Sequence, residues 1–167
     1  MATKFLIVIG AVVAVMAALV LLPSFNKGPA ATDQVQMSLE YGRQHLSRIE
    51  NGQFAATSAE TLTIGNDGSA KYSKLVGAPD EKTFRISSDD LKRLKDLILE
   101  TGFMQIPDAN YQQREGLASV TQYTLKVSVG GSTKTINWVD PDSNDSVPSI
   151  IGNVGAQLDD IITRYAS

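Results

Sequence analysis

TQYTLKVSVGGSTKTINWVD, residues Thr121–Asp140, is the stretch that decides the fold. Apolar and polar side chains alternate over residues 123–129, and after the pair Gly130–Gly131 the alternation returns with Ile136 and Trp138. A period of two residues is typical of a strand with one buried face, and adjacent glycines accept the positive φ angles of a tight turn. The stretch therefore predicts a β-hairpin, with Trp138 as a candidate for the core.

Further strands are expected on the N-terminal side of this hairpin. Apolar residues alternate with polar ones from Val35 to Tyr41, as in a half-buried strand. Thr61–Ile64 leads into Gly65–Gly68, where Asn, Asp and Gly tolerate the backbone of a tight turn, so Ser69–Leu75 is the expected returning strand. Thr83–Ile86 is expected as a short extended segment.

A first amphipathic helix is predicted to begin at Ser87. The spacing from Ser87 to Asp90 resembles a capping box, in which the two side chains accept hydrogen bonds from backbone N–H groups of the first turn. Gly102 suits the position just after the helix, and Phe103 is placed to pack back on the last turn. One face of this helix is apolar and comprises Leu91, Leu94, Leu97 and Ile98.

A second helix is predicted at the end of the chain, with Pro148 in its first turn. Its apolar stripe consists of Ile150, Ile151, Val154, Leu158, Ile161, Ile162 and Tyr165. Strands, helix, strands and helix in this order favour an α+β fold, in which an antiparallel sheet has two helices packed on one face.

The composition is that of a folded domain, since 43% of the 167 residues are hydrophobic and 20% are charged. From Ala31 onward there are 13 basic and 18 acidic residues. Such an acidic domain is repelled by phosphate backbones, so nucleic acid is not an expected partner. The chain has no cysteine, which removes disulfides, thiolate nucleophiles and most structural zinc sites.

The first part of the chain predicts a transmembrane anchor. Phe5–Leu22 has 18 residues without a charged side chain, and such a helix is about 27 Å long, close to the thickness of a hydrocarbon core. Pro23 ends it. We therefore expect an anchor over residues 1–22 that lies in the lipid bilayer through residues 5–22, a linker over 23–33, and a soluble domain over 34–167.

Two other interpretations of this segment stay open, a cleaved signal peptide and a buried soluble helix. The apolar run is longer than that of an ordinary signal peptide, and Gly28–Ala30 is the nearest approach to a cleavage site. Lys4 and the α-amino group precede the run, and Lys27 and Asp33 follow it. This small excess of positive charge favours a single-pass protein of the cell membrane with a cytoplasmic N-terminus and an extracytoplasmic domain.

Few residues of the sequence are candidates for a catalytic, metal-binding or modification site. His45 is the single histidine, and one histidine cannot form the paired spacing of a zinc hydrolase. Asp140, Asp142 and Asn144 place oxygen atoms at the spacing that Ca²⁺ uses, but the residues that follow lack the glycine and the glutamate of a calcium loop. The same residues suit an acidic turn that caps the last helix, so neither a metal site nor a cofactor is expected. Asn144 also begins an Asn-Asp-Ser sequon and is a candidate for N-glycosylation.

The segment Tyr111–Gly116 is the candidate for partner binding. It reads YQQREG and lies in a polar stretch without a regular pattern, so it is either a mobile connection or a recognition loop. Tyr111 and Arg114 are of the residue types most enriched in binding hot spots.

The outline of Phe84–Ile162 resembles the emfourin-like proteins. The quoted features are a capped helix followed by Gly-Phe-x-x-Ile-Pro from Gly102, a Tyr-x-Leu-x-Val hairpin from Tyr123, and a closing helix led by Pro148. The resemblance covers about half of the chain and implies a small α+β fold; founding members of that family inhibit thermolysin-type metallopeptidases. The double glycine that we associate with the start of that family has its nearest equivalent here in Asn51–Gly52, and no inhibitory residue is carried over.

These observations predict a non-enzymatic, membrane-anchored protein-interaction module whose partner is another membrane or extracytoplasmic protein. One form of it is an accessory subunit of a larger membrane complex, because Gly10 and the alanines of the anchor allow close helix packing, although they also suit a plain apolar anchor. The alternatives are a membrane-tethered peptidase inhibitor of the emfourin type, an extracytoplasmic solute- or cation-binding domain and, last, an unrecognised hydrolase.

Overall fold

The computed structural model describes residues 35–50, 52–78, 80–107, 111, 116–140 and 147–166, all of which belong to one compact unit that begins at Val35. The expected anchor and linker lie outside these residues. Within the described ranges, no helix combines the length and the apolar character that a membrane crossing requires.

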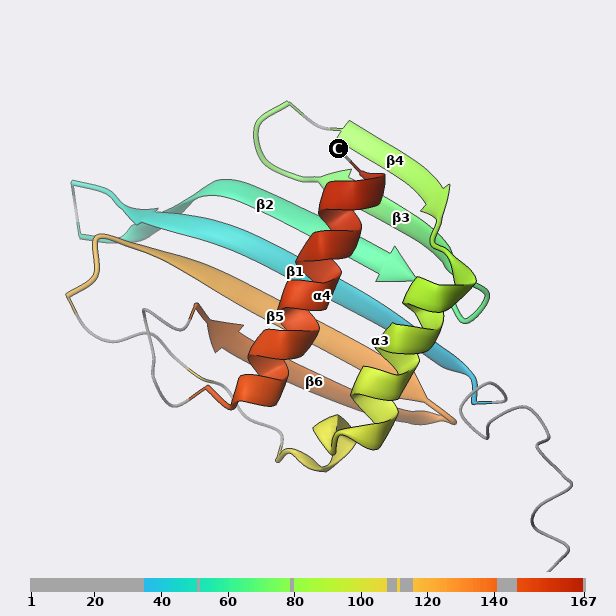
Figure 1. The fold of residues 1–167 in the computed structure, drawn as a ribbon. Coiled ribbons are helices and arrows are strands. Elements are labelled where there is room, and N and C mark those ends of the chain that lie inside the picture. The colour runs from blue at the N-terminus through green and yellow to red at the C-terminus, as the bar shows by residue number, and fades with distance from the viewer. Residues whose placement is uncertain are drawn as a thin grey trace, which may run out of the picture. The chain divides into compact units, whose positions relative to one another are not determined.

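Six antiparallel strands of the described chain form one sheet in the order β4-β3-β2-β1-β5-β6. The strands are β1 (Met37–Arg48), β2 (Phe54–Ile64), β3 (Ser69–Lys74), β4 (Asp80–Arg85), β5 (Ser119–Val129) and β6 (Ser132–Val139). The helices are α3 (Ser88–Glu100), the 3₁₀ turn η2 (Phe103–Gln105) and α4 (Ser149–Tyr165). Figure 1 shows α3 and α4 on the same face of the sheet, which confirms the expected α+β arrangement.

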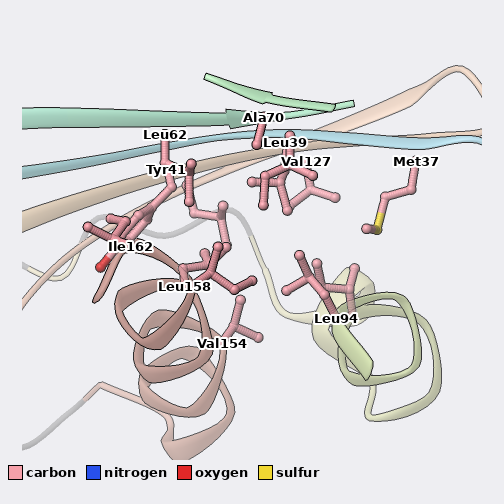
Figure 2. Packing of buried hydrophobic residues seen from close by; sticks show 14 of the residues in the cluster. Met37, Leu39, Tyr41, Leu62, Ala70, Leu94, Val127, Val154, Leu158 and Ile162 are labelled. Carbon is pink, nitrogen blue, oxygen red and sulfur yellow. The ribbon is translucent and has the colours of Figure 1, made fainter. Parts of the chain in front are cut away.

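The core lies between this face and the two helices. Figure 2 shows Leu94 of α3 and Leu158 of α4 directed toward the sheet, opposite Leu39 and Tyr41 of β1. These four side chains are at most 3% exposed. Burial of this continuous apolar layer is the main force that holds the helices on the sheet.

The expected caps and turns are present in the structure. The backbone N–H of Asp90 donates to Ser87 Oγ at 3.1 Å, as in a capping box. Gly102 has a φ of +84°, the left-handed conformation that ends a helix, and Phe103 is fully buried beside it. Gly130 and Gly131 both have positive φ angles and join β5 to β6. Pro148 precedes α4 as its N-cap residue, one position before the expected first turn.

The first strand is longer than the alternation predicts. The pattern ends at Tyr41, whereas β1 continues to Arg48 and pairs over its whole length with β5. Beyond Tyr41 the positions that continue the helix-facing row are Arg43, His45 and Ser47, because side chains alternate between the two faces. Arg43 bonds to Asp159 of α4, and His45 and Ser47 follow it in the part of β1 that extends beyond α4, so these positions need no apolar side chain.

Candidate interaction surface

The sheet has an uncovered end, formed by the last half of β1 and the segments that pair with it. In the register of the sheet, Arg43 lies between Glu60 of β2 and Tyr123 of β5, and His45 lies between Ser58 and Thr121. All of these side chains are half-buried. Figure 1 shows β1, β2 and β5 extending beyond α4 at this end, where no described helix lies over them. We call the set Arg43, His45, Ser58, Glu60, Thr121 and Tyr123 the uncovered end.

A charged cluster joins the uncovered end to α4. The guanidinium of Arg43 donates through Nη2 to Glu60 Oε2 at 2.6 Å and through Nη1 to Asp159 Oδ1 at 3.0 Å. Tyr41 Oη donates to the same Asp159 oxygen at 2.9 Å. Two carboxylates therefore share one guanidinium, so the cluster carries an excess negative charge while it fixes α4 on β1 and β2.

Burial shapes the protonation of this cluster. The pKa of Asp159 is raised because the carboxylate is partly removed from water, although Arg43 opposes this effect. The pKa of Tyr41 is raised for the same reason and because Asp159 lies beside it. The pKa of Tyr72 on β3 is raised to about 12, first by burial and then by the negative charge of Glu60. The tyrosines are thus neutral hydrogen-bond donors over the physiological pH range.

Three stacked aromatic rings form the border between the core and the uncovered end. The ring centroids of Tyr123 and Trp138 are 5.2 Å apart, and those of Tyr41 are 6.2 Å from both. Trp138 is 4% exposed, so it belongs to the core as the sequence indicated. Tyr123 is half-buried and presents an aromatic ring beside the charged cluster.

The exposed large hydrophobic residues among the described positions lie at the same end of the sheet. Ile49 is 45% exposed and follows β1, while Leu75 and Val76 are 60% and 38% exposed and follow β3. Leu75 is held beside β2, because its N–H donates to the carbonyl of Ala59 at 2.8 Å. Figure 1 shows the β1–β2 and β3–β4 connections on either side of the part of the sheet that extends beyond α4.

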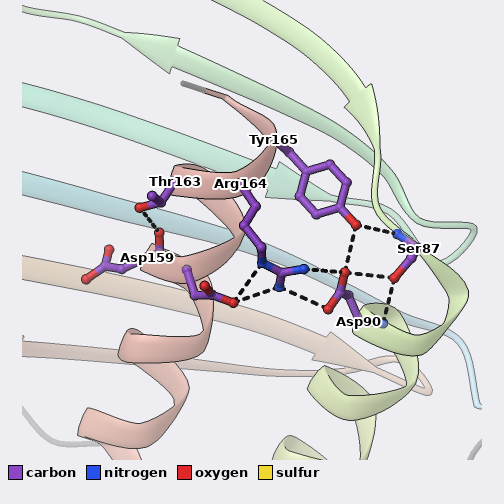
Figure 3. A network of polar contacts seen from close by, with 7 residues as sticks. Ser87, Asp90, Asp159, Thr163, Arg164 and Tyr165 are labelled. Atoms are coloured by element: carbon purple, nitrogen blue, oxygen red, sulfur yellow. Dashed lines mark hydrogen bonds and ion pairs between the residues drawn. The ribbon is translucent and has the colours of Figure 1, made fainter.

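A second polar cluster joins the two helices and has a structural role (Figure 3). Asp90 of α3 is 4% exposed and accepts hydrogen bonds from Arg164 Nη1 and Nη2, at 2.9 and 3.0 Å, and from Tyr165 Oη at 2.7 Å. Ser87 Oγ donates to the same carboxylate at 2.7 Å. The hydrogen bonds from Arg164, with those from Tyr165 and Ser87, hold the pKa of Asp90 well below its usual range.

Among the sequence-predicted site residues that the structure describes, His45 and Asp140 both contact Thr121 of β5. His45 lies within β1, with Nδ1 3.2 Å from Thr121 Oγ1. Asp140 directly follows β6 and continues its pairing with β5, because its N–H donates to Thr121 O at 3.0 Å and its Oδ2 accepts from Thr121 N–H at 2.9 Å. Asp142 and Asn144 lie outside the described residues. No group of three His, Asp or Glu side chains that could hold a metal ion is found in the described part of the chain.

Tyr111 lies beside the edge of the sheet. Its N–H donates to the carbonyl of Asn137 on β6 at 2.9 Å, and its half-buried side chain packs against the hydrophobic core. Arg114 lies outside the described residues. The polar segment therefore contains at least one side chain, that of Tyr111, which contributes to packing.

Sequence reasoning placed Ser87 and Asp90 at a helix cap but missed the contacts of Asp90 with Arg164 and Tyr165 and the whole Arg43 cluster. The available signal was a charged residue at a position where the pattern asks for an apolar one. Arg43 continues the helix-facing row of β1, and Asp159 falls directly beside Leu158 in the stripe of α4. A charged residue at such a position indicates either that it has a polar partner inside the fold or that it lies at the border of the area covered by the helices. Both are true of Arg43 and Asp159.

A comparison with protein-family models found no match, and a comparison with curated proteins found none either. The resemblance to emfourin-like proteins therefore stays a hypothesis drawn from the sequence pattern.

Proposed function

We propose that this chain is a non-enzymatic interaction domain, held at the cell membrane by residues 5–22, which binds another membrane or extracytoplasmic protein at the uncovered end of its sheet. The observation that carries the proposal is the position of Ile49, Leu75 and Val76. These exposed apolar side chains lie on the β1–β2 and β3–β4 connections, which border the part of the sheet that α3 and α4 leave uncovered. Leu75 and Val76 are consecutive in the chain, and exposed apolar side chains that lie together are typical of contact sites for proteins.

The neighbouring side chains have the chemistry of an interface. Tyr123 and Arg43 belong to residue types that are enriched in binding hot spots. Both are already ordered, by stacking on Trp138 and by ion pairs with Glu60 and Asp159, so binding costs little side-chain entropy. The excess negative charge of the cluster favours a partner that brings a basic group to this surface.

The experiment is purification of the full-length protein from its native membrane in a mild detergent. We compare the wild type with a variant that carries Ile49→Ser, Leu75→Ser and Val76→Ser. A matched control carries Thr133→Ser and Thr135→Ser, two exposed positions of β6 near the opposite end of the sheet.

The wild type and the control should retain one protein at a fixed molar ratio, and the triple variant should lose it while its thermal unfolding stays close to that of the wild type. Retention of the partner by the triple variant would refute the proposed surface. A wild type that purifies as a lone monomer would refute the proposed function itself.

Tyr111 and Arg114 are the second proposed contact region. The backbone of Tyr111 lies on the outer side of β6, away from Leu75 and Val76 beside β2. A partner that contacts this region instead should be lost on Arg114→Ala and retained by the triple variant.

A further inference from the structure

The free edge of the sheet at β4 has charged side chains in an order that would place opposite charges together if two copies of the edge paired. β4 is the outermost strand beside β3, and no described strand lies beyond it (Figure 1). Exposed strand edges present unpaired backbone groups, and many proteins protect them with short strands and charges. β4 is short and charged, but the order of its charges selects one particular partner.

The hydrogen-bond pattern shows which residues of β4 face outward. Ser69 of β3 and Leu75, the residue after β3, bond on the side of β2: Gly65 N donates to Ser69 O, and Leu75 N donates to Ala59 O. The even-numbered residues of β3 therefore bond to β4, and the bond from Ile86 N to Gly68 O agrees with this phase. It follows that Glu81, Thr83 and Arg85 direct their backbone N–H and C=O groups along the free edge.

These three residues fit a second copy of the same strand. In an antiparallel pair about a twofold axis at Thr83, outward residues oppose outward residues, so Thr83 meets its own copy. Glu81 then lies opposite Arg85 of the second copy, and Arg85 lies opposite Glu81. This register uses all three outward residues and matches both charges, whereas a register centred on Glu81 or on Arg85 places like charges opposite each other.

The charges already present on this face extend the match. Glu81 pairs with Lys71 at 2.9 Å, and Arg85 pairs with Asp67 at 3.0 Å. All four side chains are more than half exposed, so they remain accessible to a second copy. In the paired arrangement the charges alternate without interruption from Lys71 through Glu81 to Arg85 and Asp67 of the second copy.

We propose that β4 is a self-association edge, through which two copies of this chain join their sheets in antiparallel pairing about Thr83. The occupant of the edge is a second copy of this chain, because the charge pattern complements itself. The edge lies on the opposite side of the sheet from Tyr111, and the three outward residues of β4 are distinct from Ile49, Leu75 and Val76 of the proposed partner site.

The test is disulfide cross-linking of the full-length protein in detergent. The natural sequence has no cysteine, so an introduced cysteine can link only to its own copy. In the proposed pairing the two Cα atoms of Thr83 are about 5.5 Å apart, within the range of a disulfide. Thr83→Cys should therefore form a disulfide-linked dimer on mild oxidation. The matched control is Thr135→Cys, an exposed threonine on β6, the strand at the other edge of the sheet.

Charge reversal tests the register. Glu81→Arg or Arg85→Glu, each combined with Thr83→Cys, creates two like-charge pairs across the axis and should lower the dimer yield at least about fourfold. The double reversal, Glu81→Arg with Arg85→Glu, restores opposite charges and should recover the yield. Equal linking of Thr83→Cys and Thr135→Cys, or single reversals that leave the yield unchanged, would overturn the proposal.

Discussion

The contact between α4 and the aromatic stack predicts that Gly155→Ala destabilises the domain when Trp138 is present and stabilises it when Trp138 is replaced by Phe. A Cβ atom on Gly155 would lie 3.1 Å from Trp138 Cζ2, closer than ordinary packing allows. Trp138 is 4% exposed and stacks on two tyrosines, so its ring has little room to move. The helix backbone at Gly155 therefore approaches the ring as closely as it can.

The magnitude follows from two opposing terms. Gly155→Ala raises helix propensity by about 1 kcal/mol, but overpacking of a tight core costs about 1–3 kcal/mol. The variant should therefore lose about 0–2 kcal/mol of unfolding free energy. In a Trp138→Phe background the Cζ2 atom is absent, so Gly155→Ala should stabilise the domain by up to about 1 kcal/mol.

The assay is urea denaturation of residues 34–167, followed by far-UV circular dichroism for the wild type, both single variants and the double variant. Trp138→Ala belongs to the same series and should cost about 3–5 kcal/mol, since it removes a buried aromatic ring. The same effect of Gly155→Ala in both backgrounds would refute the proposed contact. A loss well under about 1 kcal/mol for Trp138→Ala would refute the burial of the ring.

Three further predictions concern acid stability, the Tyr111 segment and the N-terminus. Asp90→Asn should cost about 2–4 kcal/mol at neutral pH, because it breaks a buried cluster whose cation is partly exposed. The pKa of Asp90 is lowered in the folded state, so its stabilisation is present at pH values above the unfolded pKa of roughly 4 and is lost as the pH falls through the folded pKa. In an acid titration the unfolding free energy of Asp90→Asn should therefore fall less steeply with decreasing pH than that of the exposed control Asp89→Asn. Equal slopes for the two variants would exclude this linkage. Tyr111→Ala should lower the melting temperature, because its half-buried ring packs on the core, whereas an unchanged melting temperature would show that the contact is unimportant. N-terminal sequencing of the mature protein should find residues 1–22 retained, and a start near Ala31 would show that the segment is a cleaved signal.

The sequence predicts the parts of the fold that rest on local patterns. The hairpin at Gly130–Gly131, the cap at Ser87 and the helix end at Gly102 each depend on residues close together in the chain, and all three are confirmed. The strand order depends instead on contacts between distant segments, such as the pairing of β1 with β5. No local pattern specifies that pairing, so alternation alone could not place the strands.

The candidate surface was harder to predict than the fold. Arg43 and Asp159 are 116 positions apart, and only the fold brings them together. Ile49, Leu75 and Val76 are ordinary apolar residues in the sequence, and their exposure follows from their places on the connections after β1 and β3. Tyr111 shows the opposite error, because a polar neighbourhood concealed a side chain that packs on the core.

The most direct test of the proposed interaction site is hydrogen exchange of the full-length protein with and without its purified partner. Binding at the uncovered end should slow exchange of backbone amides in residues 45–58 and 73–78, the segments around Ile49, Leu75 and Val76, and leave those around Gly130 unchanged. Protection confined to the segment around Tyr111, or no change in residues 45–58 and 73–78, would contradict the account.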